Sequence, residues 1–317
     1  MAANVESMYY VSNEQNNRFV PWHGLGTPVR EALTSAEALK AAGLDWEVRS
    51  KSIFDETGRP IPHYIRNARS SDNSTLGIVS GRYQIVQNKE AFEFTDSLIG
   101  GEVRYETAGS LCDGRRVWLL AKIPETQILG DKFENYVAFT NSHDGTGAVQ
   151  ACVTPIRVVC QNTLNLALNS ASRRWSTRHI GDLQSKLEEG RRALNLAEVY
   201  LEQLAKQAET LVEIKVDEAK LEWMFDQLYP VTAKDSARRA QNVSDMKNGF
   251  FRCVNAPDLS QFKGTAWGVI NATTDFVDHV APIRITSNYQ ENNWGKIMLG
   301  HPTVDAMMKL LTSSVNA

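Results

Sequence analysis

The sequence lacks the short motifs that mark common catalytic and metal centres. Its 317 residues contain no GxSxG nucleophile motif, no Walker A phosphate loop and no HExxH zinc motif. The four cysteines form no CxxC pair, and no histidine stands at zinc-finger spacing from Cys112, Cys152, Cys160 or Cys253. We therefore expect no metal, no cofactor and no enzymatic activity, and we interpret the cysteines as reduced, mostly buried thiols of a cytosolic protein.

Long apolar runs and a signal peptide are also missing. No apolar stretch approaches the roughly 20 residues that span a bilayer, and no charged and apolar leader pattern is evident. We therefore expect a cytoplasmic protein without a membrane segment. Hydrophobic residues make up 42% of the chain and charged residues 22%, which is typical of a globular protein with one large or two ordinary domains.

Acidic residues are absent from one segment of an otherwise acidic chain. The protein has 34 Lys and Arg against 37 Asp and Glu, a net charge of −3, yet no Asp or Glu occurs between Gly145 and Gly181. In this segment, IRVVC over 156–160 predicts a buried strand that carries Arg157, and QNT over 161–163 can cap a helix. The segment ends with Arg173, Arg174, Trp175, Arg178 and His179.

Two interpretations of this acid-free segment stay open. The first is a core strand followed by a surface helix whose arginines are solvated. The second is a concentrated anion site, because an electric field depends on where charges lie and not only on their sum. An unpaired charge on Arg157 would be costly inside a buried strand, so this side chain must pair with a carboxylate or open onto a groove.

The spacing of apolar residues predicts an α+β fold whose N-terminal part, residues 1–180, is rich in antiparallel strands. An irregular stretch over 1–30 precedes a short helix, AEALKAAG. Strands are predicted in LDWEVRSKSIF, HYIRNAR and YQIVQ, in a hairpin around Asp113-Gly114, and on both sides of a loop over 143–147. We expect one helix over 88–99 to pack on this sheet.

The C-terminal part, residues 181–317, is predicted to be helical. Leu187, Leu194, Leu201 and Ala208 recur every seven residues and give the stretch 182–212 a coiled-coil-like seam. This seam packs either on the protein's own domain or on another subunit, and its length leads us to expect an oligomer. Further helices are predicted over 217–228, 233–253, 264–280 and 301–311.

Two residue pairs offer a chemical alternative. His143 and Asp144, in the loop SHDGTG, have the side chains of a general base oriented by a carboxylate, although Asp-Gly is also ordinary turn chemistry. Asp278 and His279, together with Asp275, are a possible part of a metal site, but Asp275 and His279 stand four residues apart and are equally a helix-surface pair, and no third ligand is evident. An enzyme would bring such groups together in one pocket.

Six segments carry a resemblance to a known family. PWHGLGTPV, AGLDWEV, GRYQIVQN, SHDGTGAV, IRVVCQNTLNLAL and AWGVINATTDFVDH follow one another from about Trp22 to His279. They are similar to the phage/plasmid-like proteins, a family defined as a domain of unknown function on mobile elements, and IRVVCQNT is the most specific piece. The resemblance implies a phage or plasmid context in a bacterial host cell and no particular reaction.

A weaker resemblance concerns the architecture of residues 1–180. A short helix, strands with a hairpin and a helix packed on the sheet look like the core of single-strand annealing proteins of the RecT, Redβ and Erf kind. Such proteins form rings or filaments and pair complementary strands without ATP. The resemblance implies a non-enzymatic, homo-oligomeric protein of phage or plasmid recombination that binds and anneals single-stranded DNA. An anti-defence or host-takeover protein that binds a host protein, and a hydrolase, remain as alternatives.

The expected DNA contacts come from arginines, which neutralise phosphates, and from aromatic rings, which stack on bases. Each of these side chains by itself is more typical of an ordinary solvated surface residue. The prediction of DNA binding therefore depends on their occurring together. Its members are Arg66, Arg82, Tyr83, Arg115, Arg116, Arg157, Arg173, Arg174, Trp175 and Arg178.

Overall fold

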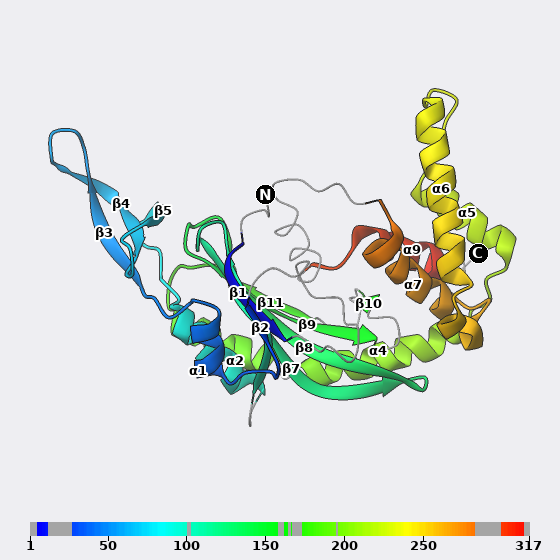
Figure 1. Cartoon of the computed structure of the whole chain (residues 1–317), viewed down its shortest axis with the longest axis horizontal. Coiled ribbons are helices and arrows are strands. Elements are labelled where there is room, and N and C mark those ends of the chain that lie inside the picture. The colour runs from blue at the N-terminus through cyan, green and yellow to red at the C-terminus, as the bar shows by residue number, and fades with distance from the viewer. Residues whose placement is uncertain are drawn as a thin grey trace.

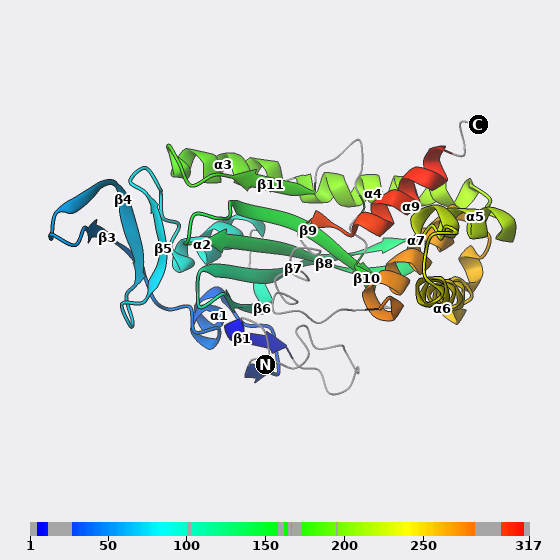
Figure 2. The same cartoon turned by 90° about the horizontal axis from the view of Figure 1, so that it is seen from above.

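A computed structural model describes residues 5–11, 27–99, 103–157, 162–163, 166, 173–194, 196–282 and 299–313. Along the longest axis, a small sheet lies at one end, a large sheet in the middle and a group of helices at the other end (Figures 1 and 2). Strands prevail in the N-terminal half and helices in the C-terminal half, which confirms the predicted α+β class.

The large sheet has eight strands. They are β1 (Val5–Val11), β2 (Thr27–Val29), β6 (Arg104–Leu111), β7 (Arg116–Ile128), β8 (Asp131–Ser142), β9 (Val149–Arg157), β10 (Asn162–Thr163) and β11 (Arg174–Thr177). Their order is β10–β9–β8–β7–β6–β1–β2, with β11 also paired to β9. Neighbours are antiparallel except for β1 and β2, which run parallel.

Tight turns join the central strands of the large sheet. Leu129 and Gly130 connect β7 to β8 with φ of 52° and 87°, and positive φ at both residues is what a type I′ hairpin turn requires. Asp113 and Gly114, between β6 and β7, have φ of 57° and 79°. The predicted hairpin at Asp113-Gly114 is confirmed, and so is the strand pair β8–β9.

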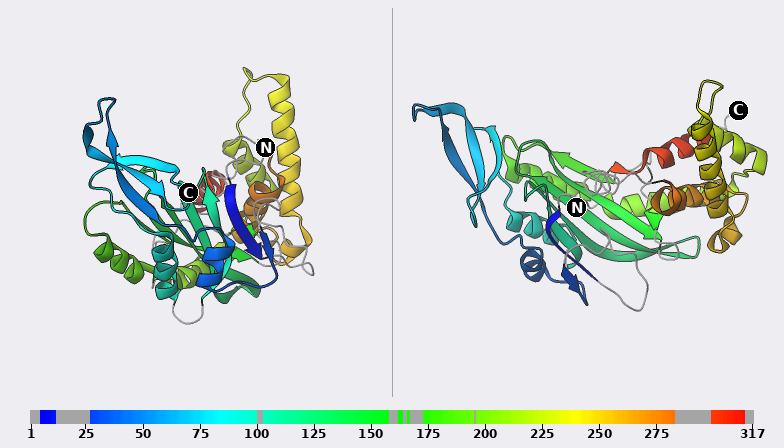
Figure 3. Two further views of the ribbon diagram at one scale, coloured as in Figure 1. Left: turned by 60° about the vertical axis from the view of Figure 1, so that its left-hand side comes forward. Right: turned by 45° about the horizontal axis from the view of Figure 1, so that its top comes forward.

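The small sheet consists of β3 (Val48–Phe54), β4 (Pro60–Arg69) and β5 (Thr75–Ser80), which are antiparallel and adjacent in this order. It stands away from the large sheet, and the β3–β4 hairpin reaches furthest out (Figure 3). The prediction of a strand in YQIVQ is wrong. Gln84 N–H donates to the carbonyl of His179 at 2.8 Å, and the Gln87 amide bonds to the backbone of Val48, so this stretch is a connection held by other segments.

Helices cover one face of the large sheet. Helix α1 (Ser35–Ala41) packs on β6, α2 (Asn88–Ile99) on β7 and β8, and α4 (Leu196–Glu213) on β7. Side chains from all three helices share one hydrophobic cluster with the sheet, among them Ala38, Phe94, Leu204, Leu119 and Phe139. The helix predicted over 88–99 is confirmed.

The helical end is built around one buried helix. It contains α5 (Glu218–Leu228), α6 (Ala237–Val254), the 3-10 turn η2 (Pro257–Phe262), α7 (Ala266–Asp275), the π-helical turn η3 (Phe276–Val280) and α9 (Pro302–Ser313). Every residue of α7 from Ala266 to Thr274 is buried. The helices predicted in this part are confirmed, with small shifts at their ends.

The heptad-patterned stretch is described as two helices, α3 (Leu183–Leu194) and α4, on either side of residue 195. The seam residues Leu201, Leu204, Ala208 and Leu211 are buried in the hydrophobic cluster of their own chain. The seam therefore gives no argument for an oligomer, and self-association stays a prediction.

The prediction that residues 1–30 are irregular is wrong for β1 and β2. Strand β1 inserts beside β6 with Met8 opposite Gly109, where a Cβ would lie 2.5 Å from the carbonyl oxygen of Ser7. The helix predicted after QNT falls mainly outside the described residues. Strands give way to helices between β11 and α3, near the predicted boundary at residue 180, and one hydrophobic cluster spans both sides.

Candidate nucleic-acid interface

One face of the small sheet is exposed. The register places Lys51 opposite Arg66 and Arg66 opposite Ile78, so alternate residues of the three strands share a side. Asn67 and Val79 point to the other side and are buried. We call the exposed side the open face; it comprises Arg49, Lys51, Tyr64, Arg66, Ile78 and Ser80. Three of these residues are cations and none is a carboxylate.

Two cations of the open face share one neutral acceptor. Lys51 Nζ lies 2.5 Å, and Arg66 Nη2 lies 3.1 Å, from the amide oxygen of Asn73 in the turn between β4 and β5. Arg66 Nη1 also donates to the hydroxyl of Thr75 at 3.3 Å. Neither cation has an acidic partner within the described part of the chain, so both charges stay uncompensated.

The small sheet and its flanking turn are positively charged on an acidic chain. Residues 48–83 contain six Lys and Arg against three Asp and Glu. Arg49, Arg59 and Arg69 each contact a carboxylate. The cations without such a contact among the described residues are Lys51, Arg66 and Arg82. Cations without a described carboxylate contact therefore lie on the open face and beside it.

Exposed apolar side chains accompany these cations. On the open face, Tyr64 is 54% and Ile78 is 61% exposed. At the outer end of the β3–β4 hairpin, Phe54 and Ile61 are exposed as well. A sheet surface that offers cations together with an accessible ring and aliphatic groups can hold an anionic chain whose bases stack.

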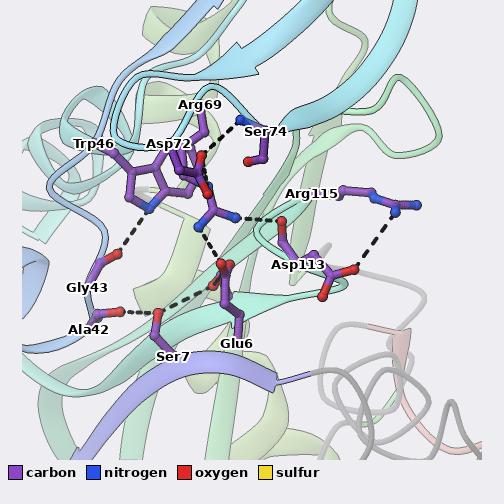
Figure 4. A network of polar contacts seen from close by, with 11 residues as sticks. Glu6, Ser7, Ala42, Gly43, Trp46, Arg69, Asp72, Ser74, Asp113 and Arg115 are labelled. Atoms are coloured by element: carbon purple, nitrogen blue, oxygen red, sulfur yellow. Dashed lines mark hydrogen bonds and ion pairs between the residues drawn. The ribbon is translucent and has the colours of Figure 1, made fainter.

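A network around Arg69 fixes the small sheet to the large one (Figure 4). The guanidinium of Arg69, with a side chain only 10% exposed, pairs with Glu6 of β1 and donates to the carbonyl of Asp113 at 2.7 Å. It also lies 5.0 Å from the ring centroid of Trp46, a cation–π distance. Since these contacts join β4, β1 and the β6–β7 turn, the open face is held in a defined orientation.

A pocket of about 530 Å³ adjoins the open face at β5. Ile78 and Ser80 belong to both the pocket and the open face. The rest of the lining comes from β5 and the residues after it, from the loop after β8 and from the residues after β11. It consists of Val79, Tyr83, Asp144, Gly145, Thr146, Gly147, Ala148, Arg178, His179 and Ile180.

The rings of Tyr83 and His179 stack on each other beside this pocket. Their centroids are 4.5 Å apart and their planes 13° from parallel. The Tyr83 hydroxyl donates to the carbonyl of Ser142, and His179 Nδ1–H donates to the carbonyl of Gln84 at 2.8 Å. Burial lowers the pKa of His179 and raises that of Tyr83, so both groups stay neutral near pH 7.

His143 is sealed in the protein and does not line the pocket. It is fully buried, and burial, reinforced by the nearby His179, lowers its pKa to about 3. Its Nε2 lies 3.0 Å from Oδ1 of Asn88, whose Nδ2 donates to the carbonyl of Leu44. His143 is therefore a neutral donor at Nε2, and its other nitrogen has no partner within the described residues.

The structure does not join His143 to Asp144. Asp144 Oδ1 accepts hydrogen bonds from the backbone and hydroxyl of Thr146, at 2.9 and 2.7 Å, as in an ordinary Asx turn. The geometry therefore lacks the carboxylate-oriented base that the HDG sequence suggests. Asp278 and His279 lie in η3, and no group of three or more His, Cys, Asp or Glu able to hold a metal ion occurs among the described residues.

The predicted DNA-binding residues lie in three places. Arg66 is on the open face, and Arg178 and Tyr83 line the adjoining pocket, with the exposed Arg82 next to Tyr83. Arg115 and Arg116 follow the β6–β7 turn, where Arg115 lies 3.8 Å from Asp113. The others lie at β9 and β11 of the large sheet: Arg157, Arg173, Arg174 and Trp175.

The end of the acid-free segment is more structural than its composition suggests. Trp175 is half-buried between Phe94, at a centroid distance of 5.7 Å, and Gly190, where a Cβ would lie 2.8 Å from the indole. Arg173 Nη1 donates to the carbonyl of Val153 at 3.2 Å. The side chain of Arg157 lies outside the described residues. Of this segment, Arg178 is the arginine that opens onto the pocket.

Arg66 is the one member of the open face in the sequence prediction, which lacks Arg49, Lys51, Tyr64, Ile78 and Ser80. The alternation in LDWEVRSKSIF already places Arg49 and Lys51 on one side of a strand. This alternation could have identified the two cations in the sequence. The position of Lys51 opposite Arg66, however, depends on the register between two strands, which the sequence alone does not determine.

Within the described part of the chain, no helix is long and apolar enough to cross a bilayer. Cys112, Cys152 and Cys253 form no disulfide within the described residues, and Cys152 and Cys253 are buried.

Comparison with known proteins places the chain in a family. A family model described as "Domain of unknown function (DUF932)" matches residues 75–295, well over half of the sequence. The chain therefore belongs to the DUF932 family, and this uncharacterised family defines no reaction. No curated protein and no solved structure matches it. The resemblance to a domain of unknown function is confirmed, and the phage or plasmid context stays a prediction.

Proposed function

We propose that this protein binds single-stranded DNA on the open face of its small sheet. The observation that carries the proposal is the pair Lys51 and Arg66, two adjacent cations whose described hydrogen-bond acceptors are neutral. A phosphate is an anionic acceptor that matches both side chains, and its binding releases condensed counterions. Because the net charge of the whole chain is −3, attraction for DNA has to come from local cations such as these two.

The apolar part of the open face favours a single strand over a duplex. Tyr64 and Ile78 are more than half exposed and flank the cations. A ring stacks on an unpaired base, whereas the bases of a duplex are already covered by their neighbours. The expected preference is therefore for single strands, with little dependence on sequence.

We further propose annealing as the role of this binding. Contacts to phosphates and to one face of a base leave the Watson–Crick edges free to pair with a second strand. A DNA strand that is longer than one open face needs several copies of the protein side by side to cover it. We therefore propose a homo-oligomer, and we propose that it acts in phage or plasmid recombination. Light scattering that gives a single 35.4 kDa chain with and without DNA would contradict the oligomer.

Fluorescence polarisation with labelled oligonucleotides tests the binding proposal. We expect the protein to bind a single strand more tightly than the matching duplex and to lose affinity between low and physiological salt. Failure to bind single strands at either salt concentration contradicts the proposal. It would favour the alternative of a protein partner, for which the exposed Phe54 and Ile61 provide an apolar contact.

A further inference from the structure

The pocket beside β5 is continuous with the open face. Ile78 and Ser80 lie on the exposed side of β5 and also line the pocket. A DNA strand that is bound across the open face therefore meets the pocket at this edge. Its volume of about 530 Å³ is that of a small-molecule site. A loop that packs closely on β5 forms one wall, since a Cβ on Gly77 would lie 2.4 Å from Cα of Asp144.

The pocket presents one cation, one carboxylate and apolar walls. Arg178 is exposed and has no acidic partner among the described residues. Asp144 has one oxygen committed to Thr146, and its other oxygen has no partner within the same part of the chain. Ile78, Val79 and Ile180 supply apolar surface.

A ligand that satisfies this lining must combine an anionic acceptor for Arg178, a hydrogen-bond donor for Asp144 and a flat apolar body. A nucleotide has all three, in its phosphate, the N–H groups of its base and the base ring. Inorganic phosphate has neither a base donor nor an apolar body, so it satisfies only Arg178.

The terminal phosphate favours a terminal nucleotide over an internal one. An internal nucleotide is joined to its neighbours by two phosphodiesters, each with one negative charge. A phosphorylated terminal nucleotide has one diester, which leads back along the strand to the open face, and one monoester, which carries close to two negative charges near pH 7. Among the described residues, Arg178 is the one Lys or Arg that lines the pocket, and this monoester can form a bidentate contact with its guanidinium.

We propose that this pocket holds the phosphorylated terminal nucleotide of a strand bound on the open face. The inference rests on the proposed function and adds to it a preference for strand ends. Arg178 binds the terminal phosphate, Asp144 accepts a hydrogen bond from the base, and Ile78 and Ile180 contact the base ring.

The test compares oligonucleotides of one sequence that carry a 5′-phosphate, a 3′-phosphate or no terminal phosphate. We expect one terminal phosphate to raise the affinity of the full-length protein about tenfold, the scale of one charge-assisted contact. R178Q should abolish this gain. The matched control is R82Q, which removes another exposed arginine that does not line the pocket, and it should retain the gain.

The outcomes separate the two proposals. Salt-dependent binding of single strands with equal affinity for all three termini overturns the terminal site and leaves the proposed function in place. An equal loss of the phosphate gain in R82Q and R178Q also overturns the terminal site and leaves the proposed function in place, because the gain then depends on overall charge and not on the pocket. No binding of any strand overturns both. Unchanged thermal unfolding of R178Q, expected for an exposed side chain, confirms that a lost gain is not lost folding.

Discussion

Lys51 and Arg66 lie directly opposite each other on antiparallel strands and share the amide oxygen of Asn73. Like charges in such a cross-strand position destabilise a sheet. Asn73 orients both side chains without neutralising them, so the arrangement is costly for folding and favourable for binding an anion.

Removal of one of these charges should not weaken the fold. K51Q ends the cross-strand repulsion while keeping a polar side chain that can reach Asn73. We expect the free energy of unfolding to stay the same or to rise by up to about 0.5 kcal/mol, while affinity for single-stranded DNA falls. Urea unfolding and fluorescence polarisation measure the two quantities. A loss of more than about 1 kcal/mol would show that Lys51 has a structural role instead.

The Arg69 network should be essential for stability. R69Q removes the guanidinium of a side chain that is only 10% exposed, together with its ion pair to Glu6 and its cation–π contact with Trp46. We expect a loss of about 2–4 kcal/mol in urea unfolding. The matched control is R59Q at the hairpin end, where the side chain is 78% exposed. Water already solvates the Arg59 guanidinium in its ion pair to Asp55, so no measurable change is expected. Equal effects of the two variants would contradict the anchoring role.

Gly77 should tolerate no side chain. A Cβ at this position would lie 2.4 Å from the backbone of Asp144, so G77A forces β5 away from the loop after β8. We expect a loss of about 1–3 kcal/mol. The control G81A lies at the end of the same strand, where the nearest atom to a Cβ is 3.7 Å away. It should be neutral or slightly stabilising. A neutral G77A in thermal unfolding would show that the contact is looser than described.

The buried His143 should make the protein sensitive to acid. Its pKa is lowered from 6.5 to about 3, so below pH 6.5 the unfolded chain binds a proton that the native state does not bind. The free energy of unfolding therefore falls as the pH drops from about 6.5 toward 3 and is unaffected above this range. At about pH 5 the contribution of this one group is a loss of about 2 kcal/mol.

H143Q tests this pH dependence because glutamine keeps a donor for Asn88 and has no titrating group. Between about pH 7.5 and pH 5, its free energy of unfolding should fall by about 2 kcal/mol less than that of the wild type. H63Q removes an exposed histidine from β4 and is the control, with the wild-type dependence expected. Identical pH profiles for H143Q and the wild type would refute the assignment.

Local patterns predict the parts of the fold whose partners are close in sequence. The helix over 88–99 and the hairpin at Asp113-Gly114 follow from capping, periodicity and turn chemistry within a few residues. Strand β1 escapes prediction because its partner β6 lies about a hundred residues away, as in the pair Met8 and Gly109. The seam through Leu201 and Leu204 has the same period whether it packs on its own chain or on another, so periodicity alone does not distinguish the two.

The candidate site is only partly visible in the sequence for the same reason. The absence of acidic residues can be read from the linear sequence. It marks Arg178, which lines the pocket, but it also marks Trp175, which packs on Phe94 and Gly190. The open face depends on register instead. A bulge between Asn67 and Ala68 shifts the pairing of β4 with β5, so the residues that join Arg66 on one side follow from the three-dimensional pairing and not from spacing.

The salt dependence of single-strand binding by the double variant K51Q/R66Q tests the central claim most directly. If each cation contacts one phosphate, the plot of log affinity against log salt should become shallower by about 1.4, since each contact contributes about 0.7 for a single strand. The control R238Q/K263Q removes the same two charges from exposed positions at the helical end and should keep the wild-type slope. A slope that is unchanged in K51Q/R66Q, or reduced equally in both double variants, would contradict the assignment of DNA binding to the open face.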